Sequence, residues 1–426
     1  MKMVAENSSF GRTDIRRVVI TGMGVVAPSG SNLDQFWRSI VGGISAAGPL
    51  TRFDRAGGPC QVACEVQGFD PVDYMEAKTA KRLERSLQFG LAAACMAKED
   101  AGIDFEQIDP DRTGVVEATS LSNVDAAYKG RRAFDERGVK AINPSLMISG
   151  YVGSGSAEIA TRIGCKGHAI TCSSSSASGN DVLGYALSMI RYEDVDIMLA
   201  GGAEAPIIDT VFSGFAQARA MTRWTGEPAQ AMKPFDEQGD GFVMGEGGAY
   251  LVLEELGHAL SRGAKIYAEV LAQGRSCEAY HPMAPEPNGK GPARAMEKAM
   301  RTAGIAPSMV DYINVHGTAN SANDIAETRA IKSFFGAHAR QLSISSTKPI
   351  TGHLLAAAGA LETVICALAL KHQVIPPTLN LRKPWPDCDL DYVRDRARPY
   401  PLEVLMNLNS GFGGKVSCLV LGRAPK

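Results

Sequence analysis

Short apolar runs alternate along most of this chain with longer stretches in which apolar residues recur at helical spacing. The runs predict buried strands within 17–27, 114–116, 169–170, 195–204, 249–253, 266–271, 310–315, 342–345, 403–408 and 416–421. The longer stretches predict helices at 33–41, 78–100, 182–190, 291–304, 323–334 and 354–370, with a largely polar stretch at 119–138. Strand, crossover helix and strand in succession imply a parallel sheet, so we expect an α/β fold.

The pattern begins again after about residue 255. Two αβ-rich halves of similar size follow one another, and no linker rich in Pro, Ser or Gly separates them. We therefore predict halves at 15–255 and 256–426, related by an internal structural duplication although no strict sequence repeat is present.

Composition narrows the function classes. The 426 residues are 45% hydrophobic and carry a net charge of −2, which gives no electrostatic case for nucleic acid or an anionic membrane surface. The nine cysteines are scattered without a disulfide-like framework, which favours reduced thiols in the cytoplasm. Cys60 and Cys64 lack further ligands nearby, so we expect no metal site.

Neither the N-terminal segment nor the most apolar helix predicts a membrane protein. Residues 1–14 lack the apolar core of a signal peptide, and we expect a short disordered lead. The most apolar helix, 354–370, is rich in Ala and Gly and contains Glu362. A helix that is apolar nearly all round is expected in a large protein core rather than in lipid.

A serine-rich stretch, T-C-S-S-S-S-A-S-G at 171–179, joins a predicted strand to a predicted helix. Such a turn places one side chain at the positive end of a helix, where a developing anion is favoured. This position is therefore a candidate for a nucleophile.

Two histidines occupy similar places in the second half. His316 ends a predicted strand, and His353 follows another and opens the Ala-rich helix. Sites of α/β sheets lie where strands give way to loops at their carboxyl ends, so both histidines point to one pocket, together with Lys348 and the serine turn.

Five ordered motifs carry a family resemblance. They are A-G-G-A-E (200–204), F-D-x-x-x-D-G-F-V-M-G-E-G (235–247), V-H-G-T (315–318) with Asn323, Asp324 and Glu327, S-T-K-P-I-T-G-H (346–353) and S-G-F-G-G (410–414). From about Arg17 to Leu421 the chain resembles the β-ketoacyl synthases, the condensing enzymes of fatty acid and polyketide synthesis. The resemblance implies a thiolase-like αβαβα five-layered double domain, a homodimer, and a pocket reached by the phosphopantetheine arm of an acyl carrier protein, with no bound cofactor or metal.

The family's nucleophile is a cysteine placed 24 residues before the first Ala of A-G-G-A-E, which is Ala200 here. That position holds Ser176, and Gly179 and Gly184 keep the family's spacing after it. The alternative is an insertion that moves Cys172 into the site, at the loss of all downstream spacing.

Serine changes the expected chemistry. Condensation requires a thiolate that accepts and releases an acyl group, whereas a serine hydroxyl needs a positioned base and its ester is a poorer acyl donor. Decarboxylation of a malonyl thioester requires instead donors on the thioester oxygen, which two neutral imidazoles can supply. The resemblance thus points to the Cys-to-Ser, ketosynthase-like malonyl-carrier-protein decarboxylases of polyketide β-branching cassettes.

In this reading each site residue has an expected role. His316 and His353 stabilise the enolate, Lys348 and Glu327 hold the charge state of the histidines, and backbone N–H groups of Ser176 and Phe412 form an oxyanion hole. Thr318, Asn320 and Thr351 are expected to bind substrate; Asn320 stands where the family usually has threonine.

Two alternatives remain open. One is a condensing or acyl-transferring enzyme with an active Ser176 or Cys172 nucleophile. The other is a non-catalytic chain-length partner that works as half of a heterodimer, although such partners usually lose the histidines that this chain keeps.

Overall fold

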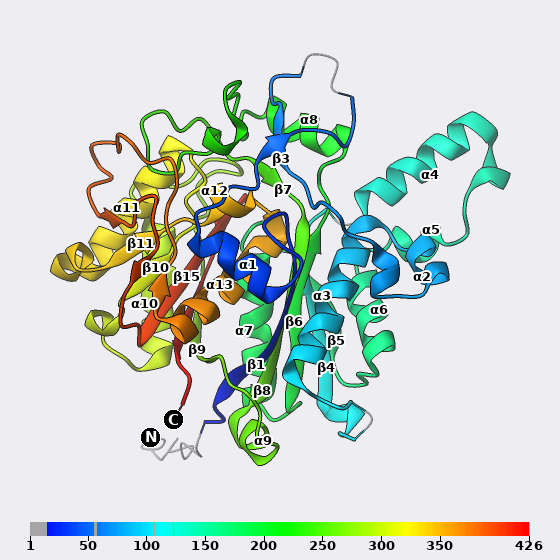
Figure 1. Ribbon diagram of the computed structural model, residues 1–426, viewed down its shortest axis with the longest axis horizontal. Coiled ribbons are helices and arrows are strands. Elements are labelled where there is room, and N and C mark those ends of the chain that lie inside the picture. The colour runs from blue at the N-terminus through cyan, green and yellow to red at the C-terminus, as the bar shows by residue number, and fades with distance from the viewer. Residues whose placement is uncertain (1–14, 55–57, 106, 122, 426) are drawn as a thin grey trace, which may run out of the picture.

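The computed structural model describes residues 15–54, 58–105, 107–121 and 123–425, so the predicted disordered lead at 1–14 lies outside the described residues. Within that part of the chain, eleven strands form one sheet in the order β13-β11-β10-β15-β16-β9-β1-β8-β6-β4-β5 (Figure 1). Their bounds are β1 (Val18–Val26), β4 (Thr113–Ala118), β5 (Ala169–Cys172), β6 (Ile197–Glu204), β8 (Gly247–Glu255), β9 (Ala268–Cys277), β10 (Tyr312–Asn314), β11 (Ser343–Ser345), β13 (Asp391–Tyr392), β15 (Val404–Gly411) and β16 (Lys415–Arg423). Short strands β2 (Gly48–Pro49), β3 (Val62–Cys64) and β7 (Met244–Gly245) pair separately, as do β12 (Val374–Ile375) and β14 (Arg398–Pro399).

The strand order repeats on either side of the sheet centre. Outward from the centre lie β1, β8, β6, β4 and β5 on one side and β9, β16, β15, β10 and β11 on the other. In both sets, the strands counted outward from the centre are the first, fifth, fourth, second and third of their set along the chain. The pairing directions also agree, antiparallel for the two inner pairs and parallel for the two outer ones. Antiparallel pairing of β1 with β9 joins the two sets. The topology shows the internal duplication, while the residue boundaries of the halves stay a prediction.

Helices form three layers around this sheet. Helices α7 (Ser178–Arg191) and α13 (Ala358–His372) lie in the central apolar core, in the middle of Figure 1. One outer core contains α3 (Arg85–Ala101) and α6 (Ser154–Ile163), and the other contains α10 (Lys290–Ala303) and α11 (Ser321–Phe335). The predicted thiolase-like αβαβα architecture is therefore confirmed.

The remaining helices lie around these layers. They are α1 (Leu33–Val41), α2 (Ala77–Arg82), α4 (Val124–Arg137), α5 (Leu146–Ser149), α8 (Asp209–Gln217), α9 (Leu256–Ser261) and α12 (Lys348–Thr351). The prediction of one helix at 78–100 was wrong, because the backbone of Leu83 is extended and separates α2 from α3. Helix α4 lies in the stretch described only as polar. It has a single buried residue, so apolar periodicity did not reveal it.

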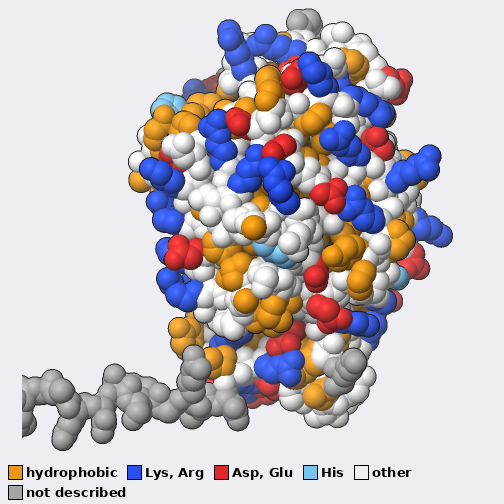
Figure 2. Space-filling view, turned by 90° about the vertical axis from the view of Figure 1, so that its left-hand side faces the viewer, with side chains coloured by type: hydrophobic (Ala, Val, Ile, Leu, Met, Phe, Trp, Pro, Cys, Tyr) orange, Lys and Arg blue, Asp and Glu red, His pale blue; other side chains and the backbone are white. Residues whose placement is uncertain are grey.

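The apolar segment Leu355–His372 has the length and hydropathy of a membrane span, yet 89% of it is buried inside the protein. It begins as a short 3₁₀ turn and continues as α13, as the prediction of a core helix required. On the face shown in Figure 2, Lys and Arg side chains are interspersed with Asp, Glu and apolar ones. This face therefore carries no continuous basic patch of the kind that nucleic acid binding uses.

Candidate active site

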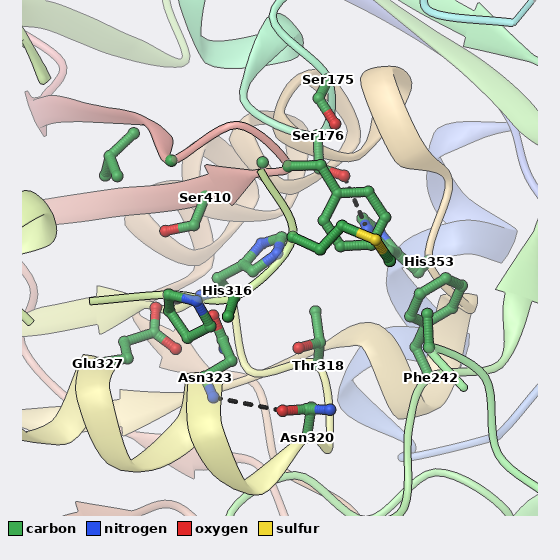
Figure 3. Close-up of a pocket in the computed structure, with 18 of the residues that line it drawn as sticks. Ser175, Ser176, Phe242, His316, Thr318, Asn320, Asn323, Glu327, His353 and Ser410 are labelled. Carbon is green, nitrogen blue, oxygen red and sulfur yellow. Dashed lines mark hydrogen bonds between the residues drawn. The ribbon is translucent and has the colours of Figure 1, made fainter. Parts of the chain in front are cut away.

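The serine turn connects β5 to α7. Ser175 has a φ of +59°, in the left-handed region that side chains rarely adopt. Two serines of the turn hold this bend: Ser178 Oγ accepts from the Ser174 nitrogen at 2.7 Å and donates to the Ser175 carbonyl at 2.6 Å. Ser174 Oγ donates to Asp181 at 2.5 Å. The bend directs Ser176 into the pocket drawn in Figure 3.

The two histidines come from neighbouring elements of the second half. His316 follows β10, and His353 follows β11 and α12; β10 and β11 are adjacent parallel strands. His353 Nε2 lies 3.0 Å from Ser176 Oγ, and the two imidazole centroids are 5.4 Å apart with planes at 83°. Both side chains are buried and line the pocket with Ser176, as predicted from the strand ends.

Burial and a nearby charge keep both imidazoles neutral. Burial is the main cause that holds the pKa of His316 and of His353 well below the ordinary value, and the positive charge of Lys348 adds to it. A neutral imidazole has one N–H to donate, which is the state that the expected chemistry requires.

Lys348 lies behind the histidines rather than in the pocket. It is 1% exposed, and its Nζ lies 2.6 Å from the Glu362 carboxylate, which is 2% exposed and also accepts from Asn409 Nδ2 at 2.8 Å. Sequence reasoning did not assign this role to Glu362. A single carboxylate in an otherwise apolar helix was the available signal, because buried charges need partners.

Glu327 contacts backbone, not an imidazole. Its carboxylate accepts from the backbone nitrogens of His316 at 2.6 Å and Gly317 at 2.9 Å, and so fixes the loop that carries His316. Burial, with a smaller contribution from the neighbouring Asp324 carboxyl, raises the pKa of Glu327 to about 8 in spite of these bonds.

Glu327→Gln is expected to flatten the pH dependence of stability between about pH 4.5 and pH 8. In that window the folded state keeps a proton that the unfolded chain releases, so the free energy of unfolding falls as pH rises. The amide removes this titration, but its NH₂ faces a backbone N–H, which costs about 1–3 kcal/mol at pH 5. Urea unfolding at pH 5 and pH 8 measures both effects, with the exposed Glu297→Gln as control. An unchanged slope would show that Glu327 is ionised throughout.

The residues predicted to bind substrate are only partly brought together. Thr318 and Asn320 line the pocket, and the Asn320 side-chain oxygen caps α11 by accepting from the Ala322 nitrogen at 3.1 Å. Thr351 is absent from the described residues that line the pocket. It is buried in α12, and its hydroxyl donates to the Gly352 carbonyl at 2.8 Å.

Cys172 and Ser176 occupy different surroundings. Cys172 ends β5, pairs with Ala118, and is not among the described pocket residues. Burial and the charge of Asp181 raise the pKa of its thiol, which disfavours a thiolate. Ser176, the residue selected by spacing, is the one beside His353.

Aromatic rings enclose the site. Phe242 makes an edge contact with the His353 ring at 4.9 Å between centroids, and Phe215 stacks on Phe412 at 6.0 Å. Phe242 lies in one of the recognised motifs, whereas no sequence signal pointed to Phe215. The end of β15, just before Phe412, touches the serine turn, since a Cβ on Gly411 would lie 2.9 Å from the Ser176 nitrogen. Among the described residues no group of three potential metal ligands occurs.

Known proteins match this chain over nearly its whole length. The sequence model of the β-ketoacyl synthase N-terminal domain matches residues 15–259, and that of the C-terminal domain matches residues 267–382. A 3-oxoacyl-[acyl-carrier-protein] synthase 2 from Coxiella burnetii is 41% identical over 408 residues, which cover 96% of this chain and 99% of the relative.

Solved structures are similar in both sequence and fold. The ketosynthase of a type II polyketide synthase, in complex with its acyl-carrier protein and bound to the hexaketide, has a TM-score of 0.89 at 34% identity and covers 97% of this chain and 100% of its own. The ishigamide ketosynthase/chain length factor has a TM-score of 0.89 at 35% identity, with 96% and 100% covered.

Proposed function

This chain belongs to the β-ketoacyl synthase family, and from that membership and its Ser176–His353 contact we propose that it decarboxylates a malonyl-carrier-protein thioester to the acetyl thioester. Ketosynthases of this family act with an acyl carrier protein, on substrates held by its phosphopantetheine arm and without a further cofactor. The curated relatives are condensing synthases by name, so decarboxylation without condensation is the part that we propose.

The serine hydroxyl at the nucleophile position carries the proposal. Its oxygen lies 3.0 Å from His353 Nε2, but a hydroxyl is far less acidic than a thiol, and an ester returns its acyl group less readily than a thioester. Chain extension through a covalent intermediate is therefore expected to be very slow. The second half of a condensing reaction needs no covalent bond to this residue.

Decarboxylation uses the groups that remain. As CO₂ leaves the malonyl group, the electron pair of the broken carbon–carbon bond forms an enolate whose negative charge resides on the thioester oxygen. N–H groups of the neutral His316 and His353 donate to that oxygen, where charge develops. His353 Nε2, which lies beside Ser176 Oγ in the free site, must carry the ring proton for this role and turn toward the substrate oxygen. A proton from water at the α-carbon then completes the acetyl thioester.

Mixing the pure protein with malonyl-carrier protein is expected to produce acetyl-carrier protein, a loss of one CO₂ in the mass of the carrier. Intact-protein mass spectrometry follows both proteins over time, and malonyl-carrier protein without enzyme is the control. No acetyl product would refute the proposal. So would accumulation of acylated Ser176 or Cys172 with chain extension when an acyl-carrier protein is added, an outcome that identifies the condensing alternative.

Homodimerisation stays a proposal and is supported by an unpaired sheet edge. Strand β5 ends the sheet and is partly exposed, and apolar side chains of the neighbouring segment 124–152 are exposed as well, namely those of Val124, Tyr128, Phe134, Val139, Met147, Ile148, Tyr151 and Val152. A second copy would cover this apolar surface. A sedimentation mass near the monomer value of 45.2 kDa would contradict it. The β-branching pathway and the cytoplasmic location likewise stay predictions.

A further inference from the structure

Two buried asparagines lie where the elements of the two halves meet behind the pocket. Asn180 is in the first turn of α7 and Asn407 is on β15, and both are 0% exposed. Their elements otherwise contribute apolar residues to the central core, such as Val182, Leu183 and Leu405. A buried amide is unfavourable unless all its hydrogen bonds are made, so this pair needs a structural reason.

The helices that carry the site touch at their backbones. A Cβ on Gly179 of α7 would lie 2.4 Å from the Ala360 nitrogen, and a Cβ on Gly359 of α13 would lie 2.6 Å from the Asn180 nitrogen. Dispersion forces stabilise such a close contact between backbones, but these forces have no preferred direction. The glycine contact alone therefore leaves the register between α7 and α13 weakly defined.

Directional hydrogen bonds from the amide of Asn407 fix the register between α7 and α13. Its Nδ2 lies 3.0 Å from Asn180 Oδ1 on α7, and on α13 it lies 3.0 Å from the Gly359 carbonyl and 2.9 Å from Thr363 Oγ1. In return, Asn180 Nδ2 donates to the backbone carbonyl of Asn407 at 2.9 Å. One side chain thus binds both helices at their point of closest approach.

Asn407 is also connected, through Asn409, to the Lys348–Glu362 ion pair behind the histidines. Asn407 Oδ1 accepts from Asn409 Nδ2 at 3.2 Å, and Asn409 donates to the Glu362 carboxylate that pairs with Lys348. The network therefore connects α7 with the lysine whose charge acts on His316 and His353.

Ser176 and His353 are both close to this contact along the chain. Ser176 lies four residues before Asn180, and His353 lies six residues before Gly359. We propose that Asn407 is a positioning residue whose amide, by holding α7 against α13, sets the separation between the Ser176 hydroxyl and the His353 imidazole. Its effect on decarboxylation rests on the proposed function, whereas its effect on this geometry does not.

A cysteine reporter tests the geometry without decarboxylation. In the Ser176→Cys protein the new thiol lies beside His353 at a helix start, an arrangement that lowers a thiol pKa. Loss of that alignment raises the thiol pKa by about one unit, so alkylation by iodoacetamide slows about tenfold at any pH below the aligned thiol's pKa. Peptide mass spectrometry measures alkylation at position 176 separately from that of the other cysteines, across a range of pH.

In this background we expect Asn407→Ser and Asn180→Ala to slow alkylation at position 176 by about tenfold and to shift its pH profile upward by about one unit. Thr363→Val is the matched control: it removes one acceptor of the same amide on α13 but leaves the bonds to Asn180 and Gly359, so alkylation stays within about twofold. If thermal unfolding shows that Asn407→Ser does not fold, Asn180→Ala decides. Unchanged alkylation in the asparagine variants, or equal slowing by Thr363→Val, would overturn the proposal.

Steady-state kinetics of variants that keep Ser176 provide a second test. With Ser176 in place, Asn180→Ala is expected to lower kcat for malonyl-carrier protein, because a looser contact between α7 and α13 displaces the His353 imidazole that stabilises the enolate. KM is expected to stay within about twofold, because Asn180 is not among the described residues that line the pocket. An unchanged kcat would contradict the link to catalysis. An inactive wild-type protein would refute the proposed function and leave the alkylation result standing.

Discussion

His316→Ala is expected to lower the rate of malonyl-carrier-protein decarboxylation by about 10²–10³-fold, the usual effect of removing one donor from a developing oxyanion. The physical reason is position: His316 is buried and neutral, its ring centroid lies 5.4 Å from that of His353, and both rings line the same pocket. Ser176→Ala removes a hydroxyl that forms no covalent bond in this reaction, and we expect a loss below about tenfold.

Steady-state formation of acetyl-carrier protein by these two variants separates the candidate mechanisms. His168→Ala is the control for a general effect of losing a histidine, because His168 precedes β5, outside the described residues that line the pocket. Equal losses in His316→Ala and Ser176→Ala would indicate a serine acyl-enzyme. A fully active His316→Ala protein would remove the enolate role of this histidine.

Lys348→Met is expected to lower the free energy of unfolding by about 3–5 kcal/mol, the cost of leaving one member of a buried ion pair without its partner. Glu362 would remain 2% exposed with Asn409 as its only remaining side-chain donor among the described contacts. Urea unfolding measures the loss. Lys348→Met combined with Glu362→Gln removes both charges, and we expect it to recover most of the stability.

The same pair of variants separates stability from electrostatics. Without the Lys348 charge, the pKa of His316 and of His353 should rise toward the ordinary value of 6.5 in both the single and the double variant. NMR titration of the imidazole C–H signals measures this rise. Recovery of stability together with unshifted histidines in the double variant would show that burial alone keeps them neutral.

Much of the site followed from local patterns. Ser176 was selected over Cys172 by counting back from Ala200, and the structure places it in the pocket beside His353. The histidines were recognised at strand ends because parallel strands present their carboxyl ends together. The five layers followed from the family motifs, whose order spans nearly the whole chain.

Other features had no local signal. Helix α4 was missed because only Ala126 of it is buried, and its ion pairs at i and i+4, such as Arg131–Asp135, are weak signals. Glu327 was expected to act on the imidazoles but binds backbone nitrogens, a choice set by how α11 packs beneath the His316 loop. Thr351 bonds its own neighbouring carbonyl instead of lining the pocket.

The sequence by itself determined which side chains stand at the chemically important positions, because spacing along strands, turns and helices is a local property of the chain. Only the tertiary structure decided which groups act on them. The Asn180–Asn407 contact and the aromatic enclosure join residues far apart in the chain, and the Lys348–Glu362 pair joins two successive helices. Burial gives these contacts their strength, because a low-dielectric interior strengthens hydrogen bonds and the attraction between opposite charges. These side chains become buried only when the elements of the folded chain pack together.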